Sequence, residues 1–62
     1  MNDRNGQPIT IDSHVFYAAE RVILKVVEID LYFKGFPTFI GDDGGTLYRW
    51  VDPRECELIS EE

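Results

Sequence analysis

Residues 37–51, PTFIGDDGGTLYRWV, carry the strongest structural signal in this chain. The apolar run Pro37 to Ile40 is followed by Gly41-Asp42-Asp43-Gly44-Gly45, and Gly and Asp favour turns because they tolerate positive φ. The residues from Thr46 to Val51 then alternate, with Thr46, Tyr48 and Trp50 on one face and Leu47, Arg49 and Val51 on the other. The segment therefore predicts a β-hairpin whose turn lies at Asp42–Gly45.

The chain that follows this hairpin continues the β pattern. Asp52-Pro53 ends the strand because proline has no N–H to donate to a sheet. Asp52-Pro53-Arg54 is typical of one turn of 3₁₀ helix, and Cys56 to Ile59 predicts a last short strand. The final residues, 60–62, are polar, and we expect a frayed tail there.

The chain that precedes the hairpin allows two interpretations. Apolar residues recur at helical spacing over 13–29, which fits an amphipathic helix packed on the hairpin in an α+β domain. Five of the residues between 22 and 29 are β-branched, however, and such residues favour strands. No capping box follows Asp12 or Ser13. We therefore expect strands at His14–Ala18 and Val22–Asp30, joined by a tight turn at Glu20-Arg21, with the helix as the alternative.

Residues 1–10, MNDRNGQPIT, contain a single interior aliphatic residue, Ile9, among Asn, Asp, Gly and Pro. This composition predicts a flexible N-terminal arm. The chain has 62 residues, which is enough for one domain. We expect that domain to span residues 11–59 and to be all-β, with about five short antiparallel strands and one 3₁₀ turn.

The order of these segments resembles an SH3-like small β-barrel of the Tudor and KOW kind. The segments that carry the resemblance are Ile11-Asp12-Ser13-His14-Val15-Phe16-Tyr17, Lys25-Val26-Val27-Glu28-Ile29, Phe39-Ile40-Gly41-Asp42-Asp43-Gly44-Gly45 and Val51-Asp52-Pro53-Arg54-Glu55-Cys56-Glu57-Leu58. The chain departs from the pattern in three places: Ser13, the glycine-free Glu20-Arg21 turn, and a long aromatic segment between Asp30 and Pro37. The resemblance implies an SH3-like open barrel that binds nucleic acid, methylated side chains or protein surfaces.

Composition limits the chemistry that the chain can perform. One cysteine, Cys56, and one histidine, His14, allow neither an intrachain disulfide nor a zinc site, and we expect no metal and no cofactor. The formal net charge is −6 and the sequence pI is about 4.5. No run of ~18 apolar residues predicts a membrane span, and residues 1–12 lack the apolar centre of a signal peptide. A free thiol fits a reducing compartment, so we expect a cytoplasmic protein.

The sequence does not favour catalysis. His14 has no Ser or Cys partner at a recognised spacing. Asp42-Asp43 is explained by the backbone preferences of a turn. Two carboxylates flank Cys56 and would raise its pKa, which favours a small core residue over a nucleophile. We therefore expect a protein that is not an enzyme.

Two sets of residues provide alternative binding hypotheses. An aromatic cage for a methylated lysine or arginine would use Tyr17, Phe39, Tyr48 and Trp50, but the core of a very small domain explains these rings better. Because Tyr48 and Trp50 share a face in the predicted strand, both would lie inside or both outside. Nucleic acid would be contacted by Arg21, Lys25 and Arg49, but a charge of −6 disfavours phosphate binding.

The favoured hypothesis is a protein-binding module that acts as an adaptor, inhibitor or accessory factor. Its contact would use a sheet edge or the apolar loop residues Leu31, Tyr32, Phe33 and Phe36, which alternatively fold back as a lid on the core. An acidic surface would select a partner with a basic surface, and a homodimer is a further possibility. The residues of that acidic surface are Asp42, Asp43, Asp52, Glu55 and Glu57.

Overall fold

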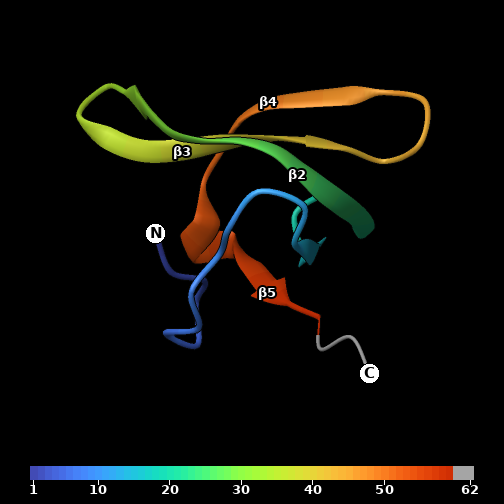
Figure 1. Ribbon diagram of the computed structural model, residues 1–62, viewed down its shortest axis with the longest axis horizontal. Helices are drawn as coiled ribbons and strands as arrows, with labels where there is room; N and C mark the ends of the chain where they lie inside the picture. The colour runs from blue at the N-terminus through green and yellow to red at the C-terminus, as the bar shows by residue number, and fades with distance from the viewer. Residues whose placement is uncertain (60–62) are drawn as a thin grey trace.

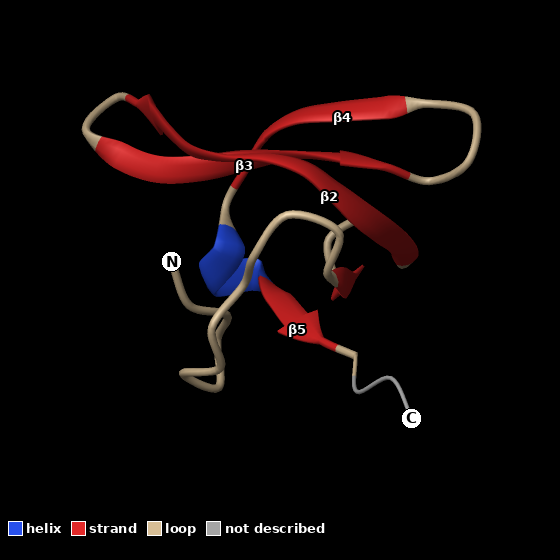
Figure 2. Ribbon diagram, in the orientation of Figure 1, coloured by secondary structure: helices blue, strands red, loops and turns tan. Residues whose placement is uncertain are grey.

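The computed structural model describes residues 1–59 and shows an all-β protein (Figures 1 and 2). The elements in chain order are β1 (His14–Tyr17), β2 (Val22–Phe33), β3 (Phe36–Asp42), β4 (Leu47–Val51), the 3₁₀ helix η1 (Pro53–Glu55) and β5 (Cys56–Leu58). The all-β prediction is confirmed, and the alternative of a helix over 13–29 is wrong. Arg21 takes a left-handed φ of 57° in the turn between β1 and β2, and this reverses the chain where a helix would continue. The expected tail at residues 60–62 lies outside the described residues.

The five strands form one antiparallel sheet in the order β4-β3-β2-β1-β5. β2 is the longest strand, and it pairs with β1 through residues 22–25 and with β3 through residues 25–33. Its register with β3 shifts twice, between Val26 and Glu28 and between Glu28 and Leu31. Such irregularities bend and twist a strand. β2, β3 and β4 consequently form one side of the molecule, while η1 and β5 lie beneath them (Figure 1). This arrangement is compatible with a small open β-barrel.

The core is small and is built by alternation along the strands. Its fully buried residues are Ile9, Val15, Leu24, Val26, Phe39, Val51 and Cys56. Gly41, which comes just before the predicted turn at Asp42–Gly45, lies inside β3. A Cβ atom at this position would lie 2.8 Å from the Cβ of Leu24, so only glycine fits there. The turn of the predicted hairpin lies one residue later than Asp42–Gly45, at residues 43–46, where the Asp43 N–H donates to the Thr46 carbonyl at 3.1 Å.

A bulge in β4 breaks the alternation predicted for residues 46–51. Phe39 pairs with Val51 and Gly41 pairs with Tyr48, so one residue of β3 faces two of β4. Trp50 takes a φ of 57° at this bulge. As a result Tyr48 packs against the core while Trp50 is 47% exposed, and the prediction that these two rings share a face is wrong.

The aromatic segment 31–37 is the tip of the β2–β3 hairpin and not a loop. Phe33 pairs with Phe36 across a two-residue turn, Lys34-Gly35. Both turn residues have positive φ, 54° and 85°, as the tight type I′ hairpin turn requires. The hydroxyl of the buried Thr38 donates to the Leu31 carbonyl at 2.6 Å and fastens the base of the tip.

Residues 1–10, which the sequence analysis places in a separate arm, pack on the domain. Ile9 is 1% exposed and belongs to the core, and Met1 packs against the core. Asp3 is 5% exposed, and its carboxylate accepts a hydrogen bond from the Leu58 N–H at 2.6 Å. A segment that composition predicts to be flexible is thus held to the core by Ile9 and to β5 by the carboxylate of Asp3.

Candidate functional site: an exposed aromatic patch

Three aromatic side chains from neighbouring strands lie together at the tip of the β2–β3 hairpin. Phe33 and Trp50 are stacked, with ring centroids 5.3 Å apart and planes inclined by 19°. Phe36 is the cross-strand partner of Phe33. Their exposed fractions are 41% for Phe33, 50% for Phe36 and 47% for Trp50. We call these three residues the aromatic patch.

The structure therefore exposes most of the loop residues that were predicted to bind a partner. Tyr32, Phe33 and Phe36 are exposed, and Leu31 is half-buried. Tyr32 pairs with Pro37 and follows the opposite face of the hairpin by strand alternation. Trp50 was missed as a member of this site. Only the bulge brings it to Phe33, and a tryptophan in the left-handed region has no clear sequence signal.

Two cations border the aromatic patch. The Lys34 Nζ lies 5.4 Å from the centroid of Phe33, and the Arg54 guanidinium lies 4.7 Å from the centroid of Phe36. Arg54 is held by Asp52, whose carboxylate accepts hydrogen bonds from Nε at 3.1 Å and from Nη2 at 2.9 Å. These hydrogen bonds lower the pKa of Asp52 and raise the pKa of Arg54. The charge of Arg54 is thus offset locally, and the guanidinium serves as a flat support for Phe36.

The four residues predicted for an aromatic cage do not converge. Phe39 is fully buried in the core and Trp50 belongs to the aromatic patch. Tyr17 and Tyr48 do meet edge to face, with centroids 6.3 Å apart. Burial and the charges of Glu55 and Glu20 raise the pKa of Tyr17, and burial with Asp43 and Glu20 raises that of Tyr48. Of the four rings, only Tyr17 and Tyr48 therefore lie together, and Glu20, which the sequence predicts only as a turn residue, is among the carboxylates near them.

The predicted acidic residues occupy separate places and mostly serve local structure. Asp42 and Asp43 accept hydrogen bonds from backbone N–H groups of the β3–β4 turn, at 2.8–3.0 Å. Asp52 caps η1 by accepting from the Arg54 N–H at 2.9 Å. Glu57 on β5 lies 3.4 Å from Arg4, and Glu55 is exposed on η1. They lie in two places, the β3–β4 turn and the segment of η1 and β5, and do not form one continuous surface.

The basic residues predicted for nucleic-acid contact are also dispersed. Arg21 lies in the turn between β1 and β2, and Arg49 is exposed on β4. Lys25 lies 3.8 Å from the carboxylate of Asp12, and the sheet register places it opposite Asp42. The charge of Lys25 is therefore paired with the carboxylate of Asp12.

Cys56 and His14 occupy structural positions. Cys56 is fully buried, and burial together with Asp52 and Glu55 raises the pKa of its thiol to about 12. It is a core residue, as the sequence predicts. His14 is half-buried at the start of β1. Within residues 1–59, no group of three or more His, Cys, Asp or Glu side chains is placed to hold a metal ion.

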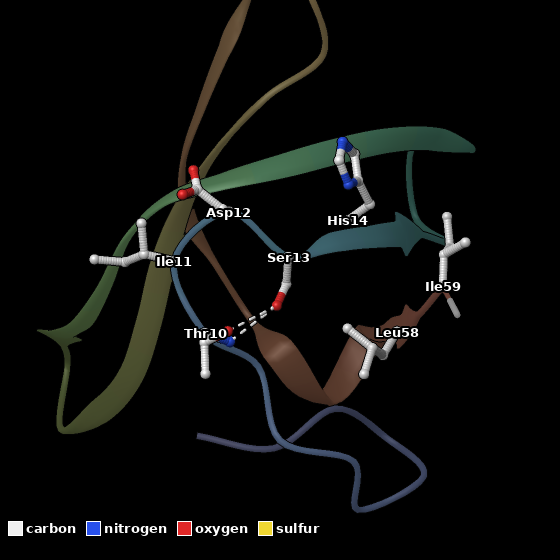
Figure 3. A pocket seen from close by; sticks show the side chains of 7 residues that line it. All are labelled: Thr10, Ile11, Asp12, Ser13, His14, Leu58 and Ile59. Atoms are coloured by element: carbon white, nitrogen blue, oxygen red, sulfur yellow. Dashed lines mark hydrogen bonds between the residues drawn. The ribbon is translucent and has the colours of Figure 1, made fainter. Parts of the chain in front are cut away.

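Two open hollows lie away from the aromatic patch. One, of about 380 Å³, lies between the Thr10–Ser13 turn and the end of β5, where Leu58 and Ile59 line it (Figure 3). The Thr10 and Ser13 hydroxyls are 3.1 Å apart at its rim. The second, of about 350 Å³, lies between His14, Lys25 and the Asp42–Gly44 turn.

Comparison of the chain with protein-family models, curated proteins and solved structures finds no match. The part of the chain that the structure describes contains no helix long and apolar enough to cross a membrane.

Proposed function

We propose that this chain is a non-enzymatic protein-binding module with an SH3-like, Tudor/KOW-like architecture. It docks through the aromatic patch into an apolar pocket of a partner protein, and a basic surface of that partner faces the carboxylates that lie outside the patch. It works in a reducing compartment such as the cytoplasm, which suits the free thiol of Cys56.

The observation that carries this proposal is the exposure of a preorganised aromatic cluster. Phe33 and Trp50 are stacked on each other and Phe36 rests on Arg54, so little side-chain freedom is lost when a partner covers them. Aromatic residues with a polar border are typical of interface hot spots. Burial of one such phenylalanine would contribute on the order of 2 kcal/mol.

The charge of the molecule supports a basic partner. The net charge of −6 attracts a positively charged surface over a distance comparable to the Debye length, about 8 Å at physiological salt. Two copies of the chain would repel each other for the same reason, which disfavours a homodimer. The association rate with a basic partner should fall as salt increases, while the apolar contact itself changes little.

The test compares partner capture by three forms of the protein. Cell extract of the source organism is passed over the immobilised wild type, the double variant Phe33→Ala/Phe36→Ala, and the control Ile23→Ala. Ile23 is 56% exposed on β2, outside the aromatic patch. We expect the double variant to lose the captured protein and Ile23→Ala to keep it.

Two further measurements separate binding from stability. The chain has one tryptophan, Trp50, so its fluorescence emission should shift to shorter wavelength when the purified partner covers the aromatic patch. The melting temperature of the double variant should remain close to that of the wild type. A large loss of stability with the partner still bound would show that the hairpin tip covers the core and that the interface lies elsewhere.

A further inference from the structure

The two edges of the sheet differ in how their backbone groups are covered. The strand order places β5 at one edge and β4 at the other. The N-terminal turn covers β5: the Arg4 N–H donates to the Cys56 carbonyl at 3.1 Å, and the Leu58 N–H donates to the Asp3 carboxylate at 2.6 Å. The edge of β5 is thus closed to another strand by this chain itself.

The outer side of β4 has no such cover. Among residues 1–59, no backbone hydrogen bond other than those of the β3 ladder involves Leu47–Val51. The side chains along this edge are open to solvent: Leu47 is 52% exposed, Trp50 is 47% exposed, and Arg49 is exposed. An uncovered edge strand offers a row of N–H and C=O groups to an incoming strand.

This open edge is continuous with the aromatic patch because Trp50 belongs to both. Its stacking on Phe33 joins β4 to the hairpin tip. A chain that lay along β4 would reach Leu47 at one end and the aromatic patch at the other. The bulge at Trp50 twists the edge and limits pairing to a short segment, which works against open-ended self-association.

Charge along the edge is unequal. Asp42 and Asp43 lie in the turn that leads into β4, whereas Asp52 at the other end is paired with Arg54. Each pairing in this sheet is antiparallel, and an antiparallel added strand would bring its C-terminal end to the acidic turn. The charge there is complementary to lysine or arginine.

We propose that β4 receives an extended segment of the partner protein as an added antiparallel strand. This segment has alternating apolar side chains and a basic C-terminal end. The proposal rests on the proposed function and adds to it the binding mode and the chemistry of the partner. The β4 strand of a second copy of the chain fits less well. Each chain has a net charge of −6 and an acidic turn, so the two chains would repel each other. Strand addition supplies affinity through backbone hydrogen bonds and specificity through alternate side chains.

The test uses synthetic peptides and the ¹⁵N-labelled protein observed by NMR. The probe is an amidated peptide of about seven residues, with alternating Val and Thr and two lysines at its C-terminal end. One control peptide has glutamates in place of the lysines. The other keeps every side chain but has N-methyl groups on alternate backbone nitrogens. We expect the lysine peptide to shift the amide signals of Leu47–Val51 and slow their hydrogen exchange, the glutamate peptide to bind several-fold more weakly, and the N-methylated peptide not to bind.

A matched pair of variants locates the contact. Leu47→Lys should weaken the binding of the lysine peptide several-fold, and Ile23→Lys should leave it unchanged, since the two wild-type side chains are 52% and 56% exposed. The proposal is overturned if the lysine peptide does not bind, if the N-methylated peptide binds equally well, or if the shifts fall outside β4. If any of these results is found while Phe33→Ala/Phe36→Ala loses partner capture, strand addition is wrong, but the proposed function is still supported. If the peptide pairs with β4 but Phe33→Ala/Phe36→Ala still captures the partner, β4 accepts an added strand and docking through the aromatic patch is wrong.

Discussion

A single carboxylate, that of Asp3, joins the N-terminal turn to the last strand. One oxygen accepts from the N–H groups of Asn5 at 2.9 Å and Gln7 at 2.7 Å, and the other accepts from Leu58 at 2.6 Å. Burial acts to raise the pKa of Asp3, but these three hydrogen bonds together with Arg4 outweigh it, so the pKa is lowered. The folded protein therefore favours the charged form of this side chain.

Replacement of Asp3 by Asn should destabilise the protein at neutral pH, because the amide has one acceptor oxygen for three donors. The loss should be about 1–3 kcal/mol, the cost of leaving a buried donor unsatisfied. Urea unfolding at pH 7 measures it. Asp30→Asn is the matched control, since Asp30 is exposed with a left-handed φ of 61° that asparagine tolerates. Equal stability of Asp3→Asn and wild type would contradict the assigned role.

The same carboxylate predicts a dependence of stability on pH. A group whose folded pKa is lowered stabilises the fold above its unfolded pKa, and that stability is lost as the pH falls through the folded pKa. For Asp3 the loss should begin near its ordinary value of 3.8 and continue below it. The wild type should therefore lose more stability than Asp3→Asn between pH 5 and pH 2. Parallel losses in the two proteins would assign the acid sensitivity to other groups, such as Asp52.

At the scale of the element, the β2–β3 hairpin determines where the aromatic patch lies. Its two-residue turn sets Phe33 directly opposite Phe36, and any longer connection would separate them. The turn has lysine at a position where φ is 54°, although asparagine is preferred in this conformation. Lys34 is thus locally unfavourable for the backbone, while its ammonium lies over the ring of Phe33.

Two substitutions in this turn should change stability in opposite directions. Lys34→Asn should raise the free energy of unfolding by roughly 0.5 kcal/mol because asparagine accepts positive φ more readily. Gly35→Ala should lower it by about 1–2 kcal/mol, since φ is 85° at that position. Gly45→Ala is the control: that glycine has no positive φ and no neighbour within 4 Å of an added Cβ. If Gly35→Ala and Gly45→Ala shift the urea midpoint equally, the turn does not have the conformation described.

The strands of this protein were predictable where composition and alternation agree. The β-branched residues over 22–29 correctly predicted β2, and the Asp–Gly turn correctly predicted the hairpin of β3 and β4. Asp52-Pro53 correctly predicted η1. The bulges were not predictable, because Trp50 and Asp30 adopt left-handed φ values through tertiary pairing rather than through local preference. The packing of residues 1–10 was also missed. It depends on the burial of Ile9 in the core and on a hydrogen bond from the Leu58 N–H, 55 residues away, to the carboxylate of Asp3.

At the scale of the whole molecule, an excess of carboxylates surrounds a very small core. Within residues 1–59, the outer edge of β4 has no strand or turn over it and aromatic rings lie beside it, while the opposite edge is closed by the N-terminal turn. The candidate site follows from this asymmetry, which no single segment of the sequence displays. Exposed aromatic side chains at 31–36 were visible in advance, but their union with β4 required the three-dimensional arrangement.

The same distribution of charge predicts that the protein does not bind nucleic acid in general. Phosphate contacts supply much of that affinity, and here Arg4, Lys25 and Arg54 each have a carboxylate partner. With a net charge of −6, we expect no retarded band in a gel-shift assay with duplex DNA or single-stranded RNA at physiological salt. The exposed rings would stack on bases only if the strand were first drawn to the surface. Binding at micromolar concentration that weakens as salt is added would contradict this prediction. It would indicate that the aromatic patch binds a nucleic-acid strand and not a protein.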